Sequence, residues 1–242
     1  MSRWAAAVRP GEARAVRLSF LAFFLLTSAL ALLRPVREAL GIEGGVERLP
    51  WMFTGTFVVT LLVIPPYSRL VARCARRQIV PMVMHVVAAS LLLFHLALRG
   101  ELPRAATGAA FFVWYSTLNL IIVAAFWSLM ADLFRSEQGR RLFGYIAGGG
   151  SAGFIAGPLL AGRLVGPLGL PNLLLLSAVL LEGVVVCVHL LLRQAQPPGT
   201  GAGPAAGPGT GGRPGGERLG GSVWAGFTAA ARQPYLRLLS VQ

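Results

Sequence analysis

The chain has 242 residues, of which 55% are apolar and only 13% carry a charge. An ordinary soluble domain has roughly 25% charged residues, so a water-exposed globular fold is excluded for most of the length. A disordered chain is excluded as well, because disordered segments are polar and poor in large apolar residues. The net charge of +13 comes from 22 arginines against 9 acidic residues, with no lysine.

Six apolar runs follow one another along the chain, and most of them are close to twenty residues long. They cover residues 18–33, 51–70, 79–98, 105–130, 142–162 and 170–192. A helix needs about 20 residues to cross the roughly 30 Å of hydrocarbon in a bilayer. The sequence therefore predicts an all-α membrane protein, with a bundle of six transmembrane helices over residues 18–193 and the lipid bilayer as its surroundings.

The first run also has features of a cleaved signal peptide. Arginines precede it, and Ala29-Leu30-Ala31 imitates a cleavage site. Arg34 and Arg37 follow the run directly, and five more spans come after it, which favours a retained first helix. Pro35 predicts the end of that helix.

Arginine placement predicts the orientation of the bundle. One set of connecting segments holds eleven arginines: 1–17, 69–77 and 135–141. The alternate set holds six: 34–48, 99–104 and 163–169. By the positive-inside rule the first set faces the cytoplasm, so we expect a multi-pass protein of a bacterial inner (plasma) membrane with both termini cytoplasmic. The charge then calls for no nucleic-acid partner.

The segments outside the bundle differ in composition. Residues 1–17 are expected to be a cytoplasmic N-terminus, and residues 194–221, rich in Gly, Pro and Ala, a flexible cytoplasmic linker. Residues 222–242 resemble a short amphipathic helix that begins a truncated second half. The two cysteines, Cys74 and Cys187, fit no disulfide framework or metal spacing, and we predict no cofactor and no metal.

Glycines form a row in the fifth span. Gly149, Gly153 and Gly157 follow one another at four-residue spacing, which predicts a smooth ridge against which another helix packs closely. Pro158 is expected to bend the outer part of this span. Tight packing alone explains the row, while a close, bendable contact would also suit a moving bundle.

The same glycines enclose a G-x-S-x-G pattern around Ser151, which together with His189 suggests an intramembrane serine protease. Depth argues against this alternative. Ser151 lies roughly 14 Å from the cytoplasmic end of its helix and His189 about 5 Å from that end. The difference is too large for a hydrogen bond between nucleophile and base, so we predict that the protein is not an enzyme.

Charged residues gather in two cytoplasmic turns. The turn after the fourth span holds Asp132, Glu137, Arg140 and Arg141, and the turn after the second holds Arg69, Arg73, Arg76 and Arg77. We hypothesise that Asp132 or Glu137 pairs with the arginines of the other turn in a cytoplasmic latch. The alternative is that both sets are solvated charges that only signal topology.

Each span carries one polar residue about 13–17 Å from its cytoplasmic edge. They are Thr27, Thr60, Ser90, Asn119, Ser151 and Glu182. This depth is the bilayer midplane, where transporters hold substrates and ions. Glu182 stands out because an ionisable residue inside the membrane is costly. It could be a protonated, buried donor, could relay protons, or could pair with a cationic substrate or another residue; His85 and His95 are its candidate partners.

A charged cluster, Arg34-Pro35-Val36-Arg37-Glu38, follows the first span. Its two arginines could attract anions at the mouth of a pathway. Alternatively, they are boundary charges that extend toward the lipid headgroups.

The six spans, the arginine-rich turn and the glycine-rich fifth span resemble the N-terminal half of a major facilitator superfamily transporter. Gly153-x-x-x-Gly157-Pro158 resembles that superfamily's fifth-helix motif. The segments RPVREALGIEGGVERLPWMFTGTFV, FWSLMADLFRSEQGRRLFGYIAGGGSAG and RQPYL are similar to the bacterial ATP:ADP antiporter (nucleotide translocase) branch.

This resemblance implies half of a twelve-helix fold and secondary active transport of a small molecule, for which a nucleotide is one candidate. It also implies that a second copy or a separate C-terminal half completes the pathway. Phosphate binding calls for basic side chains, and the arginines nearest to the spans, Arg34 and Arg163, are predicted at the outer ends. A membrane scaffold that transports nothing is the structural alternative.

Overall fold

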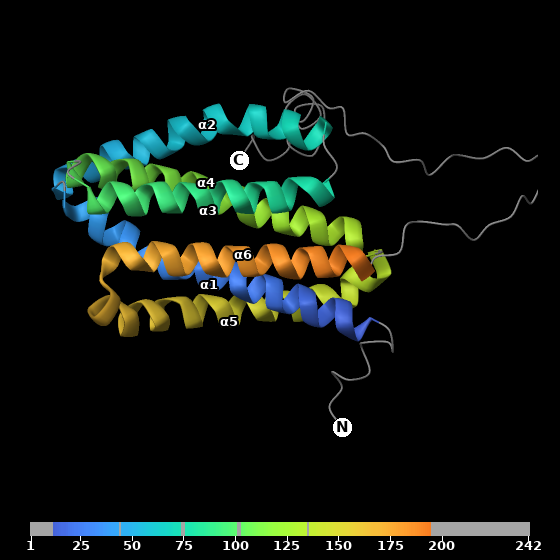
Figure 1. The fold of residues 1–242 in the computed structure, drawn as a ribbon. Helices are drawn as coiled ribbons and strands as arrows, with labels where there is room; N and C mark the ends of the chain where they lie inside the picture. The colour runs from blue at the N-terminus through green and yellow to red at the C-terminus, as the bar shows by residue number, and fades with distance from the viewer. Residues whose placement is uncertain (1–11, 44, 74–75, 101–102, 135, 195–242) are drawn as a thin grey trace, which may run out of the picture.

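The computed structural model describes residues 12–43, 45–73, 76–100, 103–134 and 136–194 (Figure 1). Helices make up nearly all of this part of the chain, and it contains no strand. The elements are α1 (Ala13–Glu43), the short 3-10 helix η2 (Val46–Arg48), α2 (Leu49–Arg73), α3 (Arg76–Arg99), α4 (Arg104–Leu133), α5 (Ser136–Leu168) and α6 (Leu170–Gln194). The predicted linker and the segment 222–242 lie outside the described residues, as do residues 1–11.

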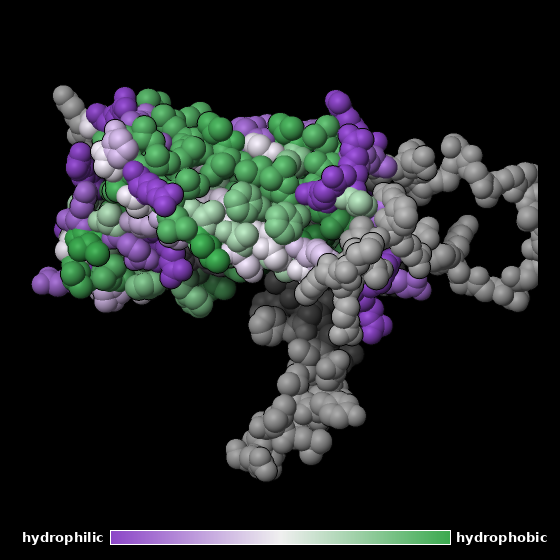
Figure 2. Space-filling model, turned by 90° about the horizontal axis from the view of Figure 1, so that it is seen from below, coloured by the Kyte–Doolittle hydropathy of each residue, from purple (hydrophilic) through white to green (hydrophobic). Residues whose placement is uncertain are grey.

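The six α-helices are all long and apolar enough to cross a membrane. Even the shortest, α3, has 24 residues, which at 1.5 Å per residue gives about 36 Å against roughly 30 Å of hydrocarbon. Figure 2 shows apolar surface along the middle of the bundle and polar residues gathered toward its two ends. The chain is thus an integral, multi-pass membrane protein, and the predicted all-α, six-helix fold is confirmed.

The first helix is longer than predicted, because Pro35 does not end it. α1 continues through Pro35 to Glu43. Pro35 has no N–H to donate to the Ala31 carbonyl four residues earlier, and packing against neighbouring helices offsets the loss of this one bond. Here the Tyr115 hydroxyl of α4 donates to the Leu30 carbonyl at 2.7 Å, and Ser177 of α6 donates to the Ala29 carbonyl at 3.1 Å.

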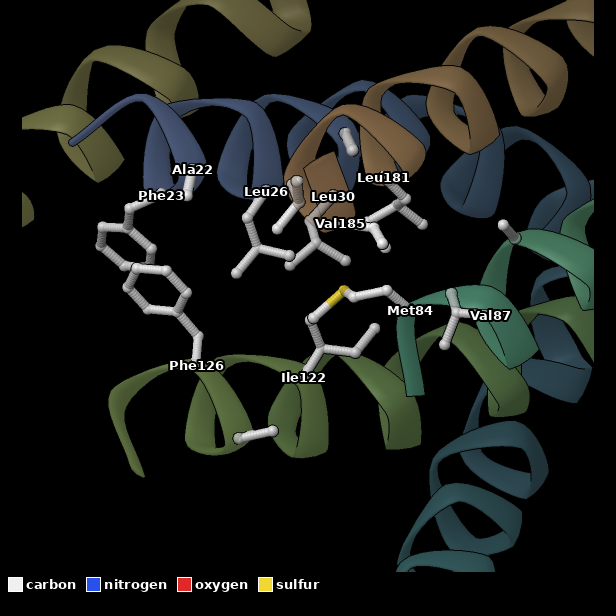
Figure 3. Close-up of a cluster of buried hydrophobic side chains, with 14 of the residues drawn as sticks. Ala22, Phe23, Leu26, Leu30, Met84, Val87, Ile122, Phe126, Leu181 and Val185 are labelled. Atoms are coloured by element: carbon white, nitrogen blue, oxygen red, sulfur yellow. The ribbon is translucent and has the colours of Figure 1, made fainter. Parts of the chain in front are cut away.

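Four helices enclose the core. α1 packs on α6 and α4, and α3 packs on the same two helices from the other side. In the close-up, Leu26 and Leu30 of α1, Ile122 of α4 and Met84 of α3 point toward one another (Figure 3). α5 lies against the outer side of α1, and α2 lies against α4 (Figure 1).

The helix contacts repeat within the bundle. Exchanging α1 with α4, α2 with α5, and α3 with α6 maps each principal pair of contacting helices onto another such pair or, for α1–α4 and α3–α6, onto itself. The pair α1–α5 becomes α4–α2, and α1–α6 becomes α4–α3. Because α1 and α4 run in opposite directions, the two three-helix units have inverted topology. The two three-helix units differ in how closely their helices pack, since α5 packs on α1 much more extensively than α2 packs on α4.

We use two names for the ends of the bundle. The near end is where α1 begins and α6 ends, and the far end is where α1 ends and α6 begins (Figure 1). At the far end a single residue, Gly169, joins α5 to α6. Its φ of +78° lies in the left-handed region, which glycine adopts without strain, and its amide donates to the Val165 carbonyl at 2.9 Å.

The glycine row of α5 lies directly on the backbone of α1. A Cβ atom on Gly149 would stand 2.5 Å from the Phe20 carbonyl oxygen, and one on Gly153 would stand 2.5 Å from that of Phe24. One on Gly157 would be 2.8 Å from the Leu32 amide nitrogen. These approaches leave no room for any side chain. Pro158 follows the row inside α5, which continues to Leu168.

Gly153→Ala should lower the free energy of unfolding by about 1–3 kcal/mol, because the added methyl group must displace the backbone of α1. The matched control is Gly144→Ala in the same helix, where a Cβ would meet nothing within 4 Å. Alanine is the better helix former, so the control should be neutral or stabilising by up to about 1 kcal/mol. Thermal unfolding in one detergent measures both; equal effects would contradict this view of the contact.

Candidate functional site

A half-buried strip runs along α4 on the side that faces α1. Ser116, Asn119, Val123 and Trp127 recur at three- and four-residue spacing, and each is partly exposed. Ser116 contacts Arg37 of α1, and Trp127 packs edge-on against Phe23 of the same helix, with ring centroids 5.2 Å apart. We call this strip and the facing side of α1 the α1/α4 seam.

Arg37 is the most heavily contacted charge in the seam. Its guanidinium carbon lies 4.6 Å from the ring centroid of Phe112 and 5.6 Å from that of Tyr115. Nη1 donates to the Ser116 hydroxyl at 3.2 Å, and Nη2 pairs with Glu38. The two aromatic rings stabilise the cation through their π faces. The planar group is therefore held between two helices rather than extended into solvent.

This arrangement leaves Arg37 with an unused donor. Nε is buried and has no hydrogen-bond partner among the described residues. Three residues before it on α1, Arg34 is exposed, so a second cation stands beside the first. Two neighbouring arginines suit an anionic ligand, while Phe112 and Tyr115 are buried and hold Arg37 from within the bundle. Phe112, Tyr115 and Ser116 were missed by the sequence analysis, because only the tertiary contact brings them to Arg37.

The remaining polar residues predicted at the midplane do not share one site. Asn119 lies in the α1/α4 seam. Thr60 of α2 is 3.3 Å, oxygen to oxygen, from Thr117 of α4, on the opposite side of α4 from the seam. Thr27 is fully buried, donates to the Phe23 carbonyl at 2.7 Å and packs against Gly153 of α5. It therefore fills a helix contact rather than lining an open surface.

Glu182 has one of its two candidate partners. His85 Nδ1 of α3 lies 2.9 Å from the Glu182 carboxylate oxygen of α6. The other candidate, His95, bonds through Nδ1 to the Pro171 carbonyl at 2.8 Å. Both residues lie on the outward sides of α3 and α6, whose inward sides pack into the core against α1 and α4, so the pair lies apart from the α1/α4 seam.

The serine and histidine of the protease alternative are each bonded within their own helix. Ser151 donates to the Ala147 carbonyl at 3.4 Å, and His189 donates from Nδ1 to the Val185 carbonyl at 2.9 Å. Within the described part of the chain, Ser151 and His189 share no hydrogen bond. Ser90 likewise donates to a carbonyl of its own helix, that of Val87, at 2.7 Å.

The polar contact at the near end involves a residue that the latch hypothesis omitted. Glu12, just before α1, accepts from Gln138 Nε2 at 2.8 Å and pairs with Arg141 at 3.5 Å. Glu12 is the only acidic residue among the arginines of segment 1–17, and this was the signal that could have identified it. It also stands at a helix N-terminus, where negative charge is favourable.

The other latch residues are placed as follows. Asp132 is exposed in the last turn of α4, and Glu137 and Arg140 are exposed in the first turns of α5. Arg73 ends α2 and Arg76 begins α3, but their side chains are not among those described. The hypothesis that Asp132 or Glu137 pairs with these two arginines therefore remains a prediction.

Arg141→Ala should lower the free energy of unfolding by roughly 1 kcal/mol, because it removes the ion pair with the well-shielded Glu12 carboxylate. Arg140→Ala is the matched control, since it removes the same charge from the neighbouring, exposed position. Denaturation in detergent at low and high salt measures both, and the Arg141 effect should shrink with salt. An Arg140 effect as large as that of Arg141 would contradict the assignment.

In the described part of the chain, no three His, Cys, Asp or Glu residues are grouped so that they could hold a metal ion. Comparison with protein-family models, with curated proteins and with solved structures finds no match. The candidate site consequently stands on its own geometry.

Proposed function

We propose that this protein is a secondary active transporter of the major facilitator type, similar to the ATP:ADP antiporters. The observation that carries the proposal is the inverted repeat of helix contacts, in which α1–α3 and α4–α6 exchange roles. Inverted-topology repeats are the common architecture of secondary transporters, and their substrate sites lie where the repeats meet. α1 and α4 are the corresponding first helices of the two units and meet at the α1/α4 seam.

The seam is then one wall of the transport pathway. Asn119 provides a hydrogen-bonding group near the midplane, and Arg34 and Arg37 provide positive charge toward the far end. A small anion is the substrate class that this wall favours, and a nucleotide is one such anion. Glu182 lies on another face and is left out of this wall.

A second six-helix unit would complete the pathway. The strip on α4 is only half-buried, so one side of the seam is open for a partner wall. A C-terminal half or a second copy of the chain could supply that wall, and rocking of the two units would alternate access to the site. The arginine excess at the near end favours a bacterial inner membrane with both termini in the cytoplasm.

Reconstituted protein should exchange radiolabelled nucleotides across a liposome membrane, and Arg37→Gln should reduce the uptake rate about tenfold or more. A hydrogen bond to a charged group contributes about 1.5–3 kcal/mol, which corresponds to that change. Arg163→Gln is the control, because it removes an exposed arginine of α5 near the far end and outside the seam.

The same vesicles are measured with and without a proton gradient, and then with other labelled organic anions. Uptake that depends on Arg37 but prefers a different anion would retain the transporter and reject the nucleotide. A protein that exchanges none of these solutes would contradict the proposal and favour a membrane scaffold.

A further inference from the structure

The outward face of α3 and α6 is mostly apolar, with the pair His85 and Glu182 near its middle and one further polar residue, the exposed His189 of α6, closer to the near end. The face is defined by side chains that are 54–67% exposed, namely Met82, Val86 and Leu93 of α3 and Val179 and Val186 of α6. Between them lie His85 and Glu182, whose side chains are 54% and 46% exposed. The inward sides of the same helices pack into the core beside α1 and α4 (Figure 3).

The pair lies deep in the membrane. At 1.5 Å per residue, Glu182 is about 17 Å from Arg193 at one end of α6 and about 18 Å from Leu170 at the other. Hydrocarbon offers no hydrogen bonds, so an ionisable group that faces lipid at this depth costs several kcal/mol. The bond between Nδ1 of His85 and one Glu182 oxygen offsets part of this cost but leaves both side chains half-exposed.

Each member of the pair has one polar atom left over. No described residue bonds to Nε2 of His85 or to the second carboxylate oxygen of Glu182. An imidazolium donates from both ring nitrogens, and a carboxylate accepts at both oxygens. With His85 protonated and Glu182 ionised, the pair presents one donor and one acceptor side by side, which makes it complementary to a copy of itself.

We propose that the α3/α6 face is the interface of a two-fold symmetric dimer, in which His85 of each copy donates from Nε2 to Glu182 of the other. The four side chains then form a closed ring of alternating imidazolium and carboxylate groups whose charges sum to zero. A two-fold axis along the membrane normal keeps both pairs at one depth and makes the contact isologous. The surrounding apolar side chains pack against their counterparts. The dimer leaves the α1/α4 seam uncovered, so it is independent of the proposed transport function.

The test replaces each member of the pair, one at a time, by the residue type of the other member. His85→Glu gives a copy with two carboxylates, and Glu182→His gives a copy with two imidazoles, so neither variant can form the ring with itself. A mixture of the two variants restores both bonds between copies while the bond within each copy stays broken. Association is measured by energy transfer between donor- and acceptor-labelled full-length chains in liposomes, over a range of protein-to-lipid ratios.

The wild-type protein should dimerise, and each variant alone should associate about tenfold or more weakly, as expected for the loss of charged hydrogen bonds. The mixture should recover most of the wild-type association. Ser151→Ala, which removes an exposed polar group of α5 at similar depth, should leave dimerisation unchanged. A wild-type monomer at all densities, single variants that dimerise normally, or a mixture that fails to associate would each overturn the proposal.

A second measurement keeps the pair intact and does not depend on whether the variants fold. In a background with Cys74→Ala and Cys187→Ala, Val86→Cys beside the pair should form a disulfide between copies on mild oxidation in the bilayer. Ile155→Cys, which is 66% exposed on α5, should not. Equal cross-linking at the two positions, or none at Val86, would contradict the interface.

Discussion

Direct contact between the backbones of α1 and α5 is the interaction on which the bundle depends. In lipid, apolar side chains gain little from leaving one apolar environment for another, so helices associate through close packing and hydrogen bonds. The glycines of α5 allow that packing, because Gly149, Gly153 and Gly157 place its backbone against the carbonyls and amides of α1. α1 is in turn the helix that also contacts α6 and α4. Its position fixes the other core helices.

The same contact explains why the two units of the inverted repeat are unequal. α2 occupies the place in its unit that α5 occupies in the other, but it packs only loosely on α4 and exposes most of its large side chains, such as Trp51 and Phe57. α2 brings Gly55 to the side chain of Val113 on α4 and has no glycine row of its own. One flank of the bundle is therefore closed and the other more open. The difference between the two flanks arises from the unequal packing of α5 on α1 and of α2 on α4.

The bundle has two polar features on different faces, and they suit different roles. The α1/α4 seam gathers Arg37 and Asn119 along a half-buried strip, which supports the proposal of a solute pathway. The His85–Glu182 pair lies on α3 and α6, whose outward sides are mostly apolar. A residue at midplane depth thus need not line a pathway, because depth along a helix does not specify which way a side chain points.

Length and apolarity of the runs were sufficient to predict six transmembrane helices, because the thickness of the hydrocarbon constrains them directly. The predicted end of α1 was wrong. Pro35 removes only the bond to the Ala31 carbonyl, and α1 stays packed on α4 and α6, which also donate hydrogen bonds from Tyr115 and Ser177 to the preceding turn. The sequence also did not determine which polar residues contact one another. Periodicity and depth place Glu182, Thr27 and Asn119 along their own helices, but rotation of each helix about its axis follows from packing against its neighbours. Only the tertiary structure decided that Glu182 pairs with His85, that Thr27 is buried against Gly153 and that Asn119 lies in the seam.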